Sequence, residues 1–228
     1  DRWIWSGDAT QSYLINKYSF FDLQTERRTM VALCGKGPLT RHFNTITDYT
    51  LFWLVSFYDH YRWTGDRAFL ERWAPRFGEV LDFCLNRRDK NGFLISPQGE
   101  WVFIDWSPAL TKDSEVYAFL QILLFGALRS AAGVYALLDR TAEASRFEEE
   151  AAALAGQIRK VFWSEEKGGF AHSLLEGSSD GRIFRQTNVM AVLTGLADER
   201  ERESILRKVL LDPGIPAVTT PYMRFYEF

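Results

Sequence analysis

The sequence is poor in the residues that bind transition metals or form disulfides. It has 2 Cys and 3 His in 228 residues, and Cys34 and Cys84 are 50 positions apart. The chain carries neither an HExxH pattern nor a Cys/His cluster with metal-ligand spacing. The two cysteines therefore indicate buried thiols and not a disulfide framework. We expect no metal site and no other cofactor.

An excess of positive charge and a long apolar run are lacking as well. The 27 Lys and Arg are opposed by 30 Asp and Glu, a formal charge of −3, so a nucleic acid partner is not expected. No apolar run reaches the about 18 residues that a membrane span needs, and no membrane partner is expected. The chain has no initiator Met and begins inside a motif, which we interpret as a fragment or processed boundary. The compartment is left open between cytoplasm, periplasm and secretion.

Aromatic residues, in contrast, are abundant: 8 Trp, 9 Tyr and 18 Phe make up 15% of the chain. Apolar residues recur at spacings of three and four, whereas strand-like alternation is scarce. The pattern predicts an all-α chain, with a loop and short strands over 92–110. Helices are predicted over residues 9–22, 47–63, 67–86, 113–138, 142–162, 186–195 and 200–210.

The predicted helices are of two alternating kinds. Helices beginning near Ile46, Glu115 and Gln186, at separations of 69 and 71 residues, are apolar nearly all round. The helices between them have one charged face and should lie outside. Repeated inner and outer hairpins predict a solenoid or, when closed, an (α/α)6 toroid. An open ring would expose apolar helices, so we expect a single partial domain over 1–228, truncated at both ends, with the remaining ring beyond Phe228.

In such a toroid the segments that lead into inner helices line the mouth of the ring. Three of them combine aromatic rings with acids: DRWIWSGD (1–8), EWVFIDWSP (100–108) and TTPYMRFYE (219–227). Rings stack on the CH faces of a sugar while carboxylates take its hydroxyls. Glycoside hydrolysis needs two carboxyl groups, and an aromatic wall keeps one of them protonated. Asp1, beside Trp3 and Trp5, fits the acid.

Several of these residues have a second, structural interpretation. Asp8 is either the cap of the following helix or a carboxylate that binds sugar hydroxyls. Arg2 is either a structural ion pair or a substrate contact. For Asp105, in FIDW, a site wall is favoured over the binding of loop amides. Further residues at helix starts that admit a structural or a site role are Asp48, Glu115, Gln186 and Asn188.

Taken together, the segments resemble the bacterial α-L-rhamnosidases of glycoside hydrolase family 78, whose catalytic domain is an (α/α)6 barrel. DRWIWSGD resembles the block of that family in which an acid and Arg precede Trp-[Ser/Thr]-Gly-Asp. WVFIDW resembles its Asp-Trp loop, and RQTNVMAVLTGLA and TTPYMRFYE resemble its later inner-helix blocks. The similarity runs in order across essentially all 228 residues.

The resemblance implies a role for each matching residue. Asp1 matches the general acid, usually Glu in the family, so the acid is shorter here by a methylene. Asp8 matches a carboxylate that binds rhamnose hydroxyls, and Asp105 with Trp106 matches a sugar-contacting pair. The substrate contacts implied together are Arg2, Trp3, Trp5, Asp8, Asp105 and Trp106.

The family inverts the anomeric centre, with the two carboxyl groups about 6.5–9.5 Å apart. By resemblance, the general base is a Glu downstream of Phe228, and another family acid precedes the first motif. The implied substrate is a rhamnose-containing glycan or glycoside, and this piece alone is expected to be inactive. Two alternatives stay open: a six-hairpin glycosidase for another sugar, and a non-catalytic helical scaffold or carbohydrate-binding toroid. Asp1, Asp8 and Asp105 in one aromatic pocket would favour the enzyme.

Overall fold

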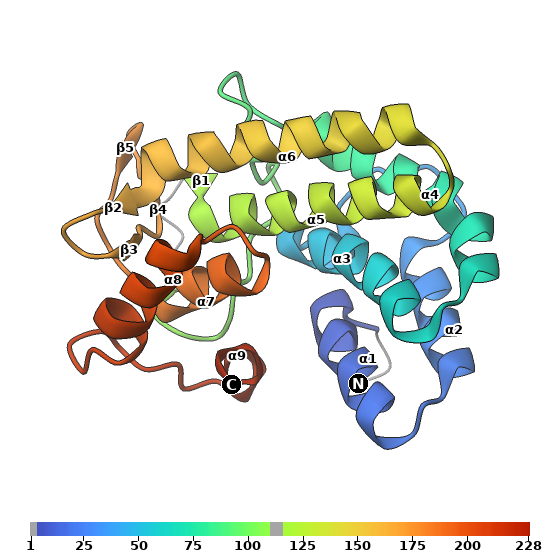
Figure 1. The fold of residues 1–228 in the computed structure, drawn as a ribbon, viewed down its shortest axis with the longest axis horizontal. Helices are drawn as coiled ribbons and strands as arrows, with labels where there is room; N and C mark the ends of the chain where they lie inside the picture. The colour runs from blue at the N-terminus through green and yellow to red at the C-terminus, as the bar shows by residue number, and fades with distance from the viewer. Residues whose placement is uncertain (1–3, 110–115) are drawn as a thin grey trace. The chain divides into compact units, whose positions relative to one another are not determined.

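A computed structural model describes residues 4–109 and 116–228, and Figure 1 shows their many helices and few short strands. The prediction of an all-α chain is thereby confirmed. The chain divides into two compact units. Unit 1 consists of residues 4–87, Pro97–Trp101 and Ala127–Glu149, and unit 2 consists of Arg88–Ser96, 102–109, 116–126 and Glu150–Phe228. That the whole chain forms one domain stays a prediction.

Unit 1 begins with two helices where the sequence predicted one. The chain turns at Phe21, whose φ of +54° lies in the left-handed region, and this ends the first helix. Asp22 then caps the second helix by accepting hydrogen bonds from the backbone N–H groups of Gln24 and Thr25. The predicted bounds 9–22 are therefore wrong, and the second helix was not predicted. The elements are α1 (Ser6–Ser19), α2 (Leu23–Cys34), η1 (Phe43–Thr45), α3 (Thr47–Thr64) and α4 (Arg67–Leu85).

The core of unit 1 lies between α3 and α4. Helix α3 is buried nearly all round, whereas α4 buries one face and leaves its charged face exposed, as predicted. The ring of Phe57 stacks on those of Trp53 and Phe77, with centroids 5.5 and 5.1 Å apart. Each such ring removes about 150–250 Å² from water, so this stack is a major part of the hydrophobic stabilisation.

A buried ionic cluster joins α1, α2 and α3. The carboxylate Oε1 of Glu26 lies 3.0 Å from Nζ of Lys17 and 2.8 Å from Nδ1 of His60, and all three side chains are buried. Burial alone would raise the pKa of the Glu26 carboxyl, but the hydrogen bond from His60 and the charge of Lys17 lower it overall. The cluster therefore keeps a carboxylate ionised within the packed helices.

Unit 2 contains helices and two small antiparallel sheets. The sheets have the strand orders β1-β4-β5 and β2-β3, with Val116 opposite Leu174 and Trp163 opposite Phe170. The strands after α6 were not predicted, and in the described residues 92–109 no strand forms. The elements are β1 (Val116–Tyr117), α5 (Ala118–Leu137), α6 (Thr141–Phe162), β2 (Trp163–Ser164), β3 (Gly169–Phe170), β4 (Ser173–Leu175), β5 (Ser178–Ser179), α7 (Arg185–Leu193), α8 (Glu199–Ile205), the π-helix η2 (Leu206–Leu210) and α9 (Pro221–Glu227). Helices α5 and α6 contribute residues to both units.

Helix α5 holds the loop that precedes the Asp-Trp segment. The side-chain amide of Gln121 accepts from the N–H of Leu94 at 2.8 Å and donates to its carbonyl at 2.9 Å. By length and composition α5 could cross a membrane, but 78% of its most apolar window is buried in the structure. Buried core helices pass the same test, so this is weak support for a membrane span.

Candidate functional site

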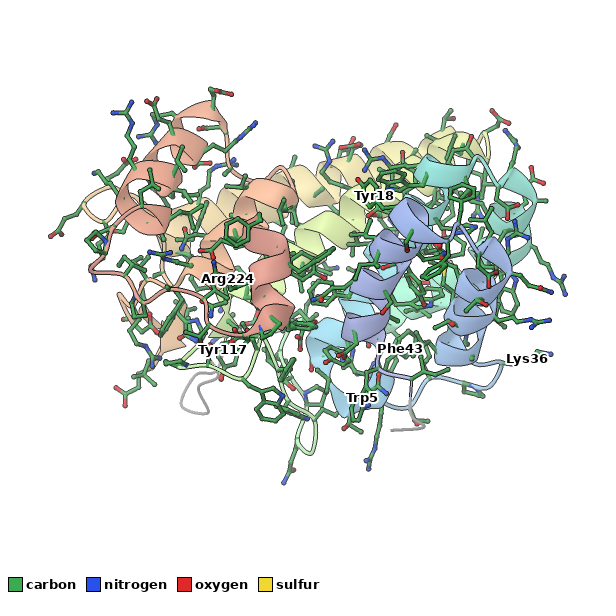
Figure 2. All side chains as sticks on the ribbon, turned by 90° about the horizontal axis from the view of Figure 1, so that it is seen from below. Trp5, Tyr18, Lys36, Phe43, Tyr117 and Arg224 are labelled. Carbon is green, nitrogen blue, oxygen red and sulfur yellow. The ribbon has the colours of Figure 1, made fainter. Side chains whose placement is uncertain are left out.

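In unit 1, the segment before α1 is fixed to the turn before α3. Asn44, which adopts a φ of +57°, donates from Nδ2 to the carbonyl of Ile4 at 2.9 Å. Its Oδ1 accepts from the N–H of Ser6 at 3.1 Å, which supplies a partner for the first turn of α1. Figure 2 shows Trp5 and Phe43, on either side of this connection, near one another. The side chain of Asn44 thus places Trp5 and the start of α1 beside α3.

Trp5 and Asp8 converge on one residue of α3. The ring of Trp5 meets Tyr49 edge to face, with centroids 6.4 Å apart. The hydroxyl of Tyr49 donates to Oδ2 of Asp8 at 3.0 Å. Tyr49 is buried, Trp5 half-buried and Asp8 exposed, so a fixed ring and a solvent-facing carboxylate stand side by side. A carboxylate has about four lone-pair sites, which leaves acceptor capacity beyond the one bond from Tyr49.

The capping interpretation of Asp8 is wrong. Helix α1 already begins at Ser6, and its cap position is occupied by Trp5, whose side chain makes no capping hydrogen bond. Asp8 lies in the first turn instead, where the helix dipole favours a negative charge. The binding of sugar hydroxyls by Asp8 stays a prediction.

Trp5 and Asp8 also line a cavity of about 730 Å³ that runs along α1 and α2. At its wall, burial, together with the charge of Glu26, raises the pKa of the Tyr13 hydroxyl, which stays protonated. Ring faces, hydroxyls and carboxylates in one concave surface suit a polyhydroxylated ligand. The lining residues are Ile4, Trp5, Asp8, Ala9, Ser12, Tyr13, Asn16, Phe20, Asp22, Thr25, Glu26 and Thr29.

In unit 2, Asp105 is fully buried and bound by side-chain donors on both oxygens. Oδ1 accepts from the hydroxyl of Ser107, and Oδ2 accepts from Nε2 of Gln186 at 3.1 Å and from Oγ1 of Thr220 at 2.8 Å. Gln186 belongs to the first turn of α7, and Thr220 is the cap residue of α9. Asp105 therefore connects its own loop to the starts of two helices.

The neighbours of Asp105 have contrasting environments. Ile104 is buried and has a φ of +56°, an outlier for a β-branched residue that costs about 1–3 kcal/mol and persists only because its surroundings enforce it. Trp106 is 72% exposed. Its ring meets Phe103 edge to face at 5.1 Å, and Phe103 meets Tyr222 of α9 at 5.5 Å. The pair Asp105 and Trp106 thus consists of a buried acid and an exposed ring, and sugar contact by either stays a prediction.

Some expected residues have a definite structural role. Neither Gln186 nor Asn188 caps α7, whose cap position is Phe184 without a side-chain bond, so the capping interpretation is wrong. Gln186 instead binds Asp105, and Asn188 binds the N–H and the carbonyl of Phe170 at 2.7 and 3.1 Å. Asp48 is fully buried in the first turn of α3.

Sequence reasoning missed three residues that position the candidate groups: Asn44, Tyr49 and Thr220. Of these, Thr220 had a signal, because Thr before Pro is typical of a helix start. Asn44 and Tyr49 had none, since nothing in the sequence pairs them with residues about 40 positions away. Asp1, Arg2, Trp3 and Glu115 lie outside the described residues. Asp8 belongs to unit 1 and Asp105 to unit 2, so a pocket common to them stays a prediction.

Other parts of the described chain offer less to a sugar. A cavity of about 770 Å³ in unit 2 is lined by residues between Glu166 and Pro216, and none of the sequence-predicted site residues that the structure describes lines it. Within residues 4–109 and 116–228, no group of three or more His, Cys, Asp or Glu side chains is placed to hold a metal ion. Cys34 and Cys84 are buried free thiols, as predicted.

The chain is similar to known rhamnosidases in sequence and in structure. The family model described as the bacterial alpha-L-rhamnosidase six-hairpin glycosidase domain matches residues 6–212. A GH78 family rhamnosidase of Bacillus sp. GL1 is 28% identical with a TM-score of 0.85, over 98% of this chain and 24% of that protein. No curated protein matches the chain.

Two further structures extend the likeness in fold. A rhamnosidase from Klebsiella oxytoca, solved with rhamnose bound, is 23% identical with a TM-score of 0.79, over 99% of this chain and 45% of that one. A cellobiose 2-epimerase from Bacillus thermoamylovorans is 8% identical with a TM-score of 0.53, over 88% of this chain and 57% of that one. The chain thus spans less than half the length of the two rhamnosidases.

The family match, together with the structural similarity, confirms the resemblance drawn from the sequence motifs and the all-α, six-hairpin class of the fold. The match begins at Ser6 and includes Asp8, Asp105 and Trp106, the exposed and buried groups described above. The chain belongs to the bacterial alpha-L-rhamnosidase six-hairpin glycosidase family.

Proposed function

We propose that the chain is part of an α-L-rhamnosidase that releases terminal rhamnose with inversion. The observation that carries the proposal is the pairing of Trp5 and Asp8 on Tyr49, within a chain of this family. An exposed carboxylate beside a fixed indole ring is a suitable surface for one sugar ring: the carboxylate takes hydroxyls and the ring packs on CH groups.

In this proposal the carboxyl groups divide the chemistry between them. Asp1 protonates the glycosidic oxygen, and a water activated by a second carboxylate attacks the anomeric carbon from the opposite face. The second carboxylate is a Glu in a later part of the protein. Asp8 holds the sugar hydroxyls and Trp5 packs on the sugar, and Arg2, Trp3 and Trp106 are proposed as further substrate contacts. No step requires a metal.

The direct test is hydrolysis of an aryl α-L-rhamnoside by the full-length protein, with NMR detection of the anomer that forms first. Inversion predicts the β anomer of rhamnose, and the α anomer would contradict the mechanism. Asp1→Asn should abolish turnover of a substrate with a poor leaving group and spare one whose leaving group needs no proton. Asp139→Asn, at an exposed acid, is the matched control.

The alternatives give different results in the same assay. Turnover of another aryl glycoside, with none of the rhamnoside, would replace rhamnose by that sugar within the same fold class. Binding of sugar without turnover of any glycoside would favour the non-catalytic carbohydrate-binding toroid. Equal turnover by the wild type and by Asp1→Asn on both leaving groups would place the acid elsewhere.

A further inference from the structure

In the Asp-Trp loop of unit 2, Asp105 lies in the interior and Trp106 lies at the surface. Asp105 has no exposed surface, and both of its oxygens accept hydrogen bonds from side chains. Trp106 is 72% exposed, and its ring and that of Phe103 meet edge to face. Most of the Trp106 side chain is therefore accessible to a ligand, whereas Asp105 has no accessible surface and its carboxylate is occupied by side-chain donors.

The hydrogen bonds around Asp105 form a complete network. Ser107 donates to Asp105 and accepts from Nε2 of Gln186 at 3.1 Å and from the N–H of Ala109 at 3.1 Å. A hydroxyl has one donor and two acceptor sites, so that of Ser107 is fully used. Thr220 donates to Asp105 and accepts from the N–H of Met223, in the first turn of α9. The bonds from Gln186 and Thr220 fix the turn between Ile104 and Ala109 to the starts of α7 and α9. The bonds of Ser107 to Asp105 and Ala109 lie within the turn.

We propose that Asp105 is a positioning residue and that Gln186 and Thr220 act with it: together they hold Trp106 as a stacking platform for the substrate. The identity of the ligand, a pyranoside ring, rests on the proposed function. The positioning of Trp106 by these three residues does not. Ile104, with its φ of +56°, is the adjoining residue that needs such support, because a β-branched residue does not adopt this conformation by itself. Phe103 adds a second connection to α9 through Tyr222.

The first readout is the environment of Trp106 itself, measured by fluorine NMR on full-length protein labelled with fluorotryptophan. Trp106→Phe identifies the resonance by its loss. Thr220→Val removes the donor to Asp105, and Gln186→Met removes both amide donors at nearly constant volume. We expect each variant to shift or broaden the Trp106 resonance, and we expect Thr220→Ser, which keeps the hydroxyl, to restore it.

Matched controls make the same chemical changes elsewhere in unit 2. Thr194→Val alters a hydroxyl that bonds only within α7, to the carbonyl of Met190, and Gln157→Met alters an exposed residue of α6. Both should leave the Trp106 resonance unchanged. An unchanged resonance in both Thr220→Val and Gln186→Met would overturn the proposal. If Thr220→Val fails to fold, Gln186→Met alone decides, since it leaves the cap of α9 in place.

The second readout is the kinetics on an aryl α-L-rhamnoside. Loss of an ordered aromatic contact should raise KM roughly three- to tenfold with kcat nearly constant, for Thr220→Val and Gln186→Met alike. In a Trp106→Ala background the same substitutions should add nothing, because their effect passes through Trp106. Asp105→Asn should likewise add nothing there. A further rise in KM in that background would show direct contact of Asp105 with the sugar and would overturn the proposal.

The two readouts separate this inference from the proposed function. If the wild type hydrolyses no rhamnoside, the proposed function fails, and the fluorine resonance still decides whether Asp105, Gln186 and Thr220 position Trp106. If the wild type is active and the resonance does not respond to either variant, the proposed function stands and the positioning role fails.

Discussion

Asp8 in unit 1 and Asp105 in unit 2 are both acids of aromatic-rich segments, yet their surroundings are opposite. Asp8 is exposed and accepts one described side-chain bond, from Tyr49. Asp105 is fully buried and accepts bonds from Ser107, Gln186 and Thr220. The difference shows that an acid of an aromatic-rich segment can be exposed with one side-chain hydrogen bond or fully buried with several. The burial of the carboxylate and the number of its hydrogen-bond donors distinguish Asp8 from Asp105, whereas their sequence motifs do not.

A buried acid with hydrogen-bond or ionic partners should contribute to the stability of the fold. Glu26 is such an acid, although it lies in none of the sequence motifs. It is buried with Lys17 and His60, and removing it leaves a buried cation without its counter-charge. We expect Glu26→Ala to lower the free energy of unfolding by about 3–5 kcal/mol, measured by urea denaturation. Glu71→Ala, at an acid about half exposed, is the control. A loss as small as that of the control would break the comparison.

Asp105→Ala should rank next. It leaves a buried donor of Gln186 and a half-buried donor of Ser107 without their acceptor, and we expect a loss of about 2–4 kcal/mol in the free energy of unfolding. Asp8→Ala should lose only about 0.5–1 kcal/mol, since its carboxylate is exposed and contributes through the helix dipole and one hydrogen bond. Equal losses in the two variants would show that the acids do not differ as described.

The segment that leads into α3 contains a buried imidazole, His42. Burial, together with the charge of Arg87, lowers the pKa of His42 from 6.5 to about 3. The adjoining Phe43 donates its N–H to Thr50, whose hydroxyl also lies 3.0 Å from Nδ1 of His42. Below pH 6.5 the unfolded chain binds a proton that the folded chain refuses, so stability is lost as the pH falls toward 3.

We expect the protonation of His42 in the unfolded chain to lower the free energy of unfolding by about 2 kcal/mol between about pH 7 and about pH 5. Urea midpoints measured across this pH range test it. His42→Asn, which has no titrating imidazole, should show a shallower dependence on pH. A slope identical to that of the wild type would assign the acid sensitivity to other groups.

An effect as small as that of Asp8→Ala is expected at the hydroxyl that bonds to Asp8. Tyr49→Phe removes the 3.0 Å bond and keeps the ring that meets Trp5. We expect a loss of about 0.5–1 kcal/mol in the free energy of unfolding and a modest rise in KM, because Asp8 keeps its charge but loses its fixed orientation. Tyr18→Phe, at a largely exposed ring, is the matched control. No change in either quantity would remove Tyr49 from the site.

The sequence was sufficient for the helical architecture and for the family, but not for the role of individual residues. Periodicity located α3 and α4 nearly to the residue, because their burial patterns are strong. It failed at Phe21, where a single left-handed residue divides α1 from α2 within an apolar stretch. It could not separate Asp8 from Asp105, since their partners Tyr49 and Thr220 are distant in the chain.

The central claim is that Asp8 faces the sugar, and calorimetric titration of full-length protein with L-rhamnose tests it most directly. The account predicts that Asp8→Asn weakens binding at least about tenfold while the unfolding midpoint is retained, with Asp139→Asn binding like the wild type. Binding of L-rhamnose by Asp8→Asn with the affinity of the wild type would contradict it.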